Sequence, residues 1–229
     1  MELFEYFRTT FIELYPSLLQ GLKVTVEVTF ISIIFVMLIG FISCMMELSH
    51  FRVLRALSKL YVFCIRGTPF MVQLYITFFG IPQLLGFAGI DFHFSAFTAS
   101  VLTCSINGGA YMTEVFRGSI LSVEKGQIEA AKSLGVSRFN TMKSVIMPQA
   151  LRNSISSIGN QFIITFKDTS ICSAIALMDI VYMGKLYIGR TLKPFVTYLV
   201  ISVFYMFVIA IVSLAIKYIE ERLRYENKN

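Results

Sequence analysis

Charged residues are scarce in this chain of 229 residues: Asp, Glu, Lys and Arg make up 15% of it, and tryptophan is absent. So few charges could not solvate the surface of a water-soluble domain, because 56% of the residues are hydrophobic and the mean hydropathy is +0.71. We therefore interpret the chain as an all-α, multi-pass membrane protein. Without tryptophan, phenylalanine and tyrosine must supply any aromatic belt at the membrane interfaces.

The sequence also lacks the short motifs that mark common catalytic sites. It has no G-x-x-x-x-G-K-[ST] phosphate loop, no G-x-S-x-G, no H-E-x-x-H and no dinucleotide fingerprint. We therefore predict that the chain is not an enzyme and binds no metal or cofactor of its own. If it pumps a solute, the energy must come from another subunit. The four cysteines have no paired spacing, and we interpret them as small apolar packing residues.

Five windows are long and apolar enough to cross a hydrocarbon core of about 30 Å. They lie at residues 24–46, 60–81, 94–116, 155–183 and 195–216. The fourth contains Lys167 and Asp168, so we expect it to be kinked or to be two shorter helices in series. Residues 1–20 mix aromatic and charged side chains, which suits an amphipathic segment at the membrane surface. The whole chain, residues 1–229, is predicted to form a single transmembrane domain.

The distribution of Lys and Arg predicts the orientation in the membrane. With the N-terminus outside and five spans, the C-terminus and the connections at 47–59 and 117–154 are cytoplasmic. These two connections and residues 217–229 hold 13 of the 20 Lys and Arg residues, as the positive-inside rule requires. Cytoplasmic cations meet anionic lipid head groups, so the net charge of +6 implies membrane lipid and no nucleic acid as a partner.

The cytoplasmic loop at residues 117–154 is polar but shows strong helix signals. Residues 127–134 are good helix formers, Gly135 is a natural stop, and Ser137 can cap a second helix that begins at Arg138. Pro148 is then expected to end that helix and redirect the chain to the membrane. Three apolar side chains share one face of the second helix: Phe139, Met142 and Ile146.

The first of these two helices has features of a docking element. Ala130 and Ala131 give it a low profile that would let it press into a groove, and Glu129 adds an anchoring charge. Two other interpretations remain open. One is the turn of a DNA-binding helix-turn-helix, although 38 residues between two spans are too few for a three-helix core. The other is an ordinary solvated loop with no partner.

Several motifs, in the right order, resemble a known family. The first group is the E-A-A-x-x-x-G segment followed by I-x-x-P, matched by Glu129, Ala130, Ala131, Gly135, Ile146 and Pro148. This pattern is similar to that of the membrane-spanning permease subunits of bacterial ATP-binding-cassette (ABC) importers. Further stretches resemble the polar amino-acid branch of that family: Arg66-Gly67-Thr68-Pro69 with Gln73, Gly109-Ala110-Tyr111 with Glu114 and Arg117-Gly118, Val123-Glu124-Lys125-Gly126-Gln127, and Lys167-Asp168-Thr169-Ser170.

The resemblance implies a type I ABC importer permease fold with a five-helix core in the bacterial inner membrane. It implies that the permease pairs with a second copy or a paralogous permease. Two other partners follow: an ATPase subunit with a phosphate loop, which uses ATP and Mg, and an extracytoplasmic substrate-binding protein. The substrate would be an amino acid of the histidine, glutamine, arginine or cystine type. The E-A-A segment would be a coupling helix seated in a cleft of the ATPase, with Glu129, Ala130, Ala131, Gly135 and Arg138 as the coupling residues.

Polar groups inside the spans are candidates for the substrate pathway, since each costs roughly 2 to 4 kcal/mol in lipid and is expected to face the bundle interior or water. The set, which includes polar stripes on spans three and four, is Arg66, Thr68, Gln73, Asn107, Tyr111, Glu114, Gln161, Thr165, Lys167, Asp168, Thr169 and Ser170. A third stripe on span one comprises Thr25, Thr29 and Ser32, and the three stripes are predicted to line one cavity.

A zwitterionic amino acid needs a cation for its carboxylate and an acid for its ammonium group, and Arg66 and Asp168 could supply one each. An equally open alternative is that Arg66 or Lys167 pairs with an acid and only holds helices together. Two other function classes also remain. A stand-alone secondary carrier or channel for small polar solutes would need no ATPase, and an intramembrane enzyme would need a nucleophile and base that the sequence does not show.

Overall fold

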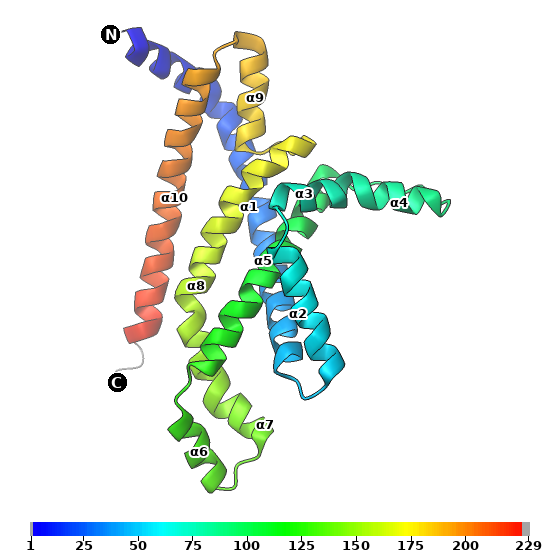
Figure 1. Ribbon diagram of the computed structural model, residues 1–229. Helices are drawn as coiled ribbons and strands as arrows, with labels where there is room; N and C mark the ends of the chain where they lie inside the picture. Colours follow the sequence, from blue (N-terminus) through cyan, green and yellow to red (C-terminus); the bar gives the residue numbers. More distant parts are fainter. Residues whose placement is uncertain (1, 226–229) are drawn as a thin grey trace.

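The computed structural model describes residues 2–225, and every regular element within that range is helical (Figure 1). Ten α-helices follow one another: α1 Glu2–Leu48, α2 Arg52–Arg66, α3 Phe70–Tyr75, α4 Ile81–Phe87, α5 Ala96–Leu121, α6 Lys125–Ser133, α7 Arg138–Thr141, α8 Met147–Asp168, α9 Ile180–Thr191 and α10 Pro194–Tyr225. Two π-helical turns, η1 Ile76–Gly80 and η2 Met142–Ile146, and a 3-10 helix, η3 Thr169–Ile175, lie between them. The prediction of an all-α protein is confirmed.

Helices α1 and α5 form the centre of the molecule and pack along each other more extensively than any other pair. Gly108 of α5 makes this possible, because a Cβ atom there would lie 2.6 Å from Val36 of α1 and 3.0 Å from Gln161 of α8. Figure 1 shows α2 and α8 beside this central pair, α10 at the outer edge and α6 with α7 at one end. Helix α5 therefore contacts the rest of the bundle on several sides.

Fewer helices are long and apolar enough to cross a membrane than the five spans that we predicted. Within residues 2–225, three helical stretches are long and apolar enough: Phe4–Leu48, Phe70–Phe87 and Pro194–Arg222. A pair bent by 43°, Arg138–Ile175 with Ile180–Thr191, makes four if it counts as one span. Helix α5 is long enough to cross a membrane, but its Ser, Thr, Asn and Gly residues lower its mean hydropathy. These residues are mostly buried against neighbouring helices, so α5 does not need an apolar surface all round.

The fourth window is two helices in series, as one of our two alternatives predicted. Helix α8 continues into η3, the chain turns at Ala176, which has a φ of 60°, and α9 begins at Ile180. The start of α9 is capped by the fully buried Asp179, whose carboxylate accepts hydrogen bonds from the backbone N–H groups of Tyr182 at 2.9 Å and Val181 at 3.2 Å.

The second window is also broken. Helix α2 ends at Arg66, and α3 begins at Phe70 after the Gly67-Thr68-Pro69 turn. Helix α4 then projects sideways from the body of the molecule (Figure 1). The π-helical turn η1 ends two residues before Pro82, which stands in the first turn of α4. A proline ring crowds the carbonyl group four residues earlier, and a wider π turn relieves that crowding.

The N-terminal segment, predicted at residues 1–20, is continuous with the first span in one 47-residue helix. Leu14 and Leu18 are buried in a cluster with residues of α9 and α10, such as Ile180 and Val200. The segment is therefore part of the bundle along one face. Its position at the membrane surface stays a prediction, and Met1 and residues 226–229, at the predicted outer and cytoplasmic ends, lie outside the described residues.

Three of the four cysteines are packing residues, as we expected. Cys44, Cys104 and Cys172 are buried in two of the hydrophobic clusters between the helices. Cys64 departs from this expectation because it lies exposed on α2.

Candidate functional site

The predicted docking helix is α6, and its end is sharply defined. Gly135 has a φ of 73°, a left-handed conformation that a residue with a side chain rarely adopts. The N–H of Gly135 donates to the carbonyl of Lys132, and the N–H of Val136 donates to that of Ala131, both at 3.0 Å. These two bonds form a Schellman motif, which turns the chain back directly after the helix. The prediction that Gly135 stops the helix is confirmed.

The second helix of the loop begins where we predicted but does not end there. The Ser137 side chain accepts a hydrogen bond from the N–H of Asn140, which caps α7. Pro148 was expected to end the helix, and this is wrong, because α7, η2 and α8 follow one another without a break. As at Pro82, a π-helical turn ends two residues before Pro148 and accommodates its ring.

The tip formed by α6 and α7 presents apolar and charged side chains to solvent. Leu134 is 83% exposed and Phe139 is 75% exposed, and Glu129 and Arg138 are exposed as well. Large exposed apolar side chains at a polar tip are typical of an interaction surface.

The two alanines of the tip face in different directions. Ala130 is exposed, as the docking prediction requires, whereas Ala131 is buried. Ala131 therefore packs within the chain, and the prediction of a low-profile outer surface holds for Ala130 only.

The break between α2 and α3 is held by Gln73. Its amide nitrogen donates to the carbonyl of Ile65 at 2.7 Å, and to the carbonyl and hydroxyl of Thr68 at 3.0 and 2.9 Å. Its amide oxygen accepts a hydrogen bond from the Asn107 side chain of α5 at 2.9 Å. Three of the predicted pathway residues, Thr68, Gln73 and Asn107, are thus joined, and the broken helix is tied to α5.

Arg66 stacks on an aromatic ring. Its guanidinium carbon lies 5.2 Å from the centre of the Tyr111 ring, a cation–π contact, and Tyr111 is 42% exposed. Within residues 2–225, neither Arg66 nor Lys167 lies within 4.0 Å of an acidic side chain. The ion pair that this alternative requires is therefore not formed within the described part of the chain.

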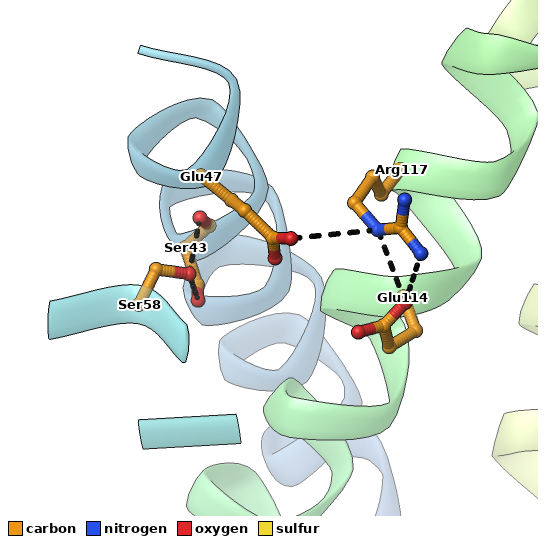
Figure 2. Close-up of polar contacts among 5 residues, drawn as sticks. All are labelled: Ser43, Glu47, Ser58, Glu114 and Arg117. Carbon is orange, nitrogen blue, oxygen red and sulfur yellow. Dashed lines mark hydrogen bonds and ion pairs between the residues drawn. The ribbon is translucent and has the colours of Figure 1, made fainter. Parts of the chain in front are cut away.

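Glu114 belongs to an ion cluster at the ends of α1 and α5 (Figure 2). Arg117 donates to one oxygen of Glu114 from Nε at 3.1 Å and from Nη2 at 2.8 Å, and its Nε lies 3.6 Å from Glu47 of α1. The hydrogen bonds that Arg117 donates to Glu114 raise the pKa of Arg117, which stays positively charged. Beside this cluster, Ser58 of α2 donates to the carbonyl of Ser43 at 2.8 Å, and the two hydroxyls lie 2.8 Å apart.

The cluster includes residues that the sequence analysis missed. Glu47 falls at the edge of a predicted span and was grouped with the loop that follows. No signal in the sequence singles it out, because Arg117 already has an acidic partner, Glu114, three residues earlier on its own helix.

The three polar stripes do not line one cavity in this structure. Thr25, Thr29 and Ser32 of α1 are fully buried, and Ser32 donates to the carbonyl of Val101 of α5 at 3.4 Å. Gln161 lies against Gly108 and donates to Thr165 at 3.3 Å. Ser32 thus joins α1 to α5, whereas the hydrogen bonds of Thr29 and Gln161 stay within their own helices. The buried Thr25 hydroxyl has no hydrogen-bond partner among the described residues.

A separate cavity of about 370 Å³ lies between α8, η3, α9 and α10. Two predicted pathway residues, Lys167 and Ser170, line it together with Tyr198, Ser202 and Tyr205 of α10. The three α10 residues were missed, although their spacing of four and three places them on one helical face. Thr169 is buried and donates to the Phe166 carbonyl at 2.7 Å, and Asp168 is half-buried in the same segment.

The chain matches a family and several curated proteins over most of its length. The model for "Binding-protein-dependent transport system inner membrane component" matches residues 37–225. The chain is 36% identical over 203 residues to the "Probable amino-acid permease protein YxeN" of Bacillus subtilis, with 89% of each chain covered. It is 31% identical over 209 residues to the "Glutamine transport system permease protein GlnP" of Escherichia coli, with 91% of this chain and 94% of that protein covered.

Solved structures show the same fold. The crystal structure of "an amino acid ABC transporter with histidines" has a TM-score of 0.86 and 31% identity, covering 93% of this chain and 97% of that one. An inward-facing structure of the MetNI methionine ABC transporter has a TM-score of 0.74 at 16% identity, covering 90% and 96%, and shows likeness of fold alone. The type I ABC importer permease fold predicted from the motifs is confirmed.

Proposed function

Since this chain belongs to the family of binding-protein-dependent transport system inner membrane components, we propose that it carries polar amino acids across the bacterial inner membrane. It is a permease subunit of an ABC importer, which argues against a stand-alone carrier or channel. Relatives that match it over about nine-tenths of its length are named as amino-acid and glutamine permeases, and this observation carries the substrate class.

The tip formed by α6 and α7 is the proposed docking site for a separate ATPase subunit. Its support is the exposed apolar pair Leu134 and Phe139 beside the exposed charges of Glu129 and Arg138. The Schellman turn at Gly135 fixes the direction in which α6 points. A short helix fixed at its end can pass on a displacement, whereas a flexible loop would absorb it.

The orientation that we propose places this tip in the cytoplasm. Figure 1 shows α6 and α7 at the same end of the molecule as the connection between α1 and α2 and the last turns of α10. The beginning of α1 and the connection between α9 and α10 lie at the opposite end. This arrangement agrees with the positive-inside count and with an N-terminus outside.

The substrate pathway is proposed to follow the exposed polar surface beside the broken helix and the cavity on the other side of the bundle. Arg66 and Tyr111 offer a cation and an aromatic face, and Lys167 and Ser170 line the cavity. Alternating access needs a second wall, which a second copy or a paralogous permease would supply. An external binding protein would deliver the amino acid to the outer end.

A gentle-detergent pull-down tests the proposal. Tagged wild-type chain, Glu129→Lys and a matched control, Glu221→Lys, are purified from native membranes and compared by mass spectrometry. Glu221 is exposed near the end of α10 and pairs only loosely with Lys217, at 3.9 Å. We expect an ATPase with a phosphate loop to co-purify with wild type and with Glu221→Lys but not with Glu129→Lys. Recovery of folded chain alone in all three preparations would contradict the proposed partner.

A further inference from the structure

The ion cluster of Glu47, Glu114 and Arg117 has two acids for one cation. Glu114 takes both hydrogen bonds from Arg117, at 2.8 and 3.1 Å. Glu47 lies 3.6 Å from Nε, which is ion-pair distance but beyond hydrogen-bond range. The Glu47 side chain is only 12% exposed, so its charge has lost most of its water without gaining a hydrogen bond from Arg117.

A small movement would exchange the two partners of Arg117. An approach of about 0.7 Å would bring Nε to the usual N–H···O distance of roughly 2.9 Å from Glu47. The guanidinium group has five N–H donors in a planar fork, so it can bond the second acid before it releases the first. The two arrangements have the same charges and similar partners, which are the conditions for a two-state element.

The cluster lies where three parts of the molecule meet. Glu47 is the last residue but one of α1, and the Ser43–Ser58 contact beside it fastens α2 to α1 (Figure 2). Arg117 stands one turn before the end of α5, which leads into α6 after three residues. The buried side chains of Ile120 and Val123 belong to the same apolar cluster as residues of α1 and of the α6 to α8 segment. A displacement of α6 therefore reaches α5 at Arg117.

We propose that Arg117 is a positioning residue that couples the ATPase-docking tip to the α1–α2 pair by exchanging between Glu114 and Glu47. In the arrangement seen here it bonds Glu114 on its own helix. When a docked ATPase displaces α6, the end of α5 moves toward α1 and Arg117 bonds Glu47. This inference rests on the proposed function, because it assumes that α6 receives a force from an ATPase.

Two neutral variants separate a switch from a static contact. Glu47→Gln removes the negative charge of the second partner and leaves the present hydrogen bonds of Arg117 intact. Glu114→Gln weakens those present bonds and leaves Glu47 available. A static contact predicts that Glu114→Gln does more harm in every assay. A switch predicts the opposite order for coupling, since only Glu47→Gln weakens the state that Arg117 must reach.

The measurement is ATP hydrolysed per amino acid transported, in liposomes that contain the whole complex with its ATPase and binding protein. We expect Glu47→Gln to keep ATPase activity within about twofold of wild type and to transport about tenfold less per ATP, the scale of one charge-assisted hydrogen bond. Glu114→Gln should unfold at a lower temperature than Glu47→Gln but stay better coupled. Glu221→Gln, which alters an exposed pair at the end of α10, is the matched control and should behave as wild type.

The possible outcomes test the Arg117 switch separately from the proposed importer function. If wild type transports and Glu47→Gln is equally well coupled, or if Glu114→Gln loses more coupling, the switch is refuted and the importer remains. If the wild-type complex shows no ATP-driven uptake, the proposed function fails, whatever the variants do.

Discussion

The crossing of α1 with the start of α9 allows a sharp test of the packing. A Cβ atom built on Gly21 would lie 2.7 Å from the backbone nitrogen of Ile180 and 2.8 Å from the carbonyl carbon and oxygen of Asp179. All three atoms are backbone, so no side-chain rotation can relieve the contact. Gly21→Ala must push α1 away from α9 by more than half an ångström, since ordinary contacts begin near 3.4 Å.

Overpacking of this kind costs about 1 to 3 kcal/mol, and alanine in place of glycine returns up to about 1 kcal/mol of helix propensity. We therefore expect Gly21→Ala to lower stability by about 1 to 2 kcal/mol, or about 2 to 8 °C in Tm for a chain of this size. Thermal unfolding of the purified chain in detergent, followed by circular dichroism, measures the shift.

The matched control is Gly118→Ala in α5, where a Cβ atom would meet nothing within 4 Å. It should unfold at or above the wild-type temperature. A Gly21→Ala protein that is as stable as Gly118→Ala would refute the close approach of α1 and α9.

Three further variants test other parts of the structure. Gln73→Leu removes the hydrogen bonds that hold the α2–α3 break and the tie to Asn107, and should cost about 1 to 2 kcal/mol in SDS-titration unfolding. Asp179→Ala removes the buried cap of α9 and should cost about 1 to 2 kcal/mol in the same assay, whereas Asp179→Asn should recover most of this. Gly135→Ala places a side chain at a φ of 73°, and the strain of about 1 kcal/mol should weaken ATPase binding about fivefold in a titration. Gly126→Ala, which has open space around it, should bind as wild type.

The elements that sequence reasoning located well are those set by local rules. Gly135 ends α6 and Ser137 caps α7, because a left-handed glycine and a hydroxyl acceptor act within a few residues of their own position. The division of the fourth window was also predicted, from the charged residues Lys167 and Asp168 within it. In each case the signal and the structure lie in the same short stretch.

The features that were missed depend on contacts between distant segments. Pro148 does not end its helix, because the π turn before it accommodates the ring while the segment packs against α1 and α5. The spacing of Thr25, Thr29 and Ser32 suggested that they line a pathway, but all three are buried, and Ser32 donates to α5. Glu47 and Arg117 are 70 positions apart, and a single sequence gives no sign that their helices end side by side.

Helix α5 connects the candidate pathway with the docking tip. Asn107 donates a hydrogen bond to Gln73 of the broken helix, and Tyr111 makes the cation–π contact with Arg66. Arg117 lies at ion-pair distance from Glu47 at the end of α1. From Asn107 to the end of α5 at Leu121 the helix advances 14 residues, which corresponds to roughly 21 Å. A helix of this length transmits an axial displacement with little loss, because stretching it would break backbone hydrogen bonds. If α6 is the docking site that we propose, a shift that it passes to the end of α5 should disturb the Gln73 contact. We therefore expect a variant that weakens this contact to reduce the transport obtained per ATP even where the ATPase still binds.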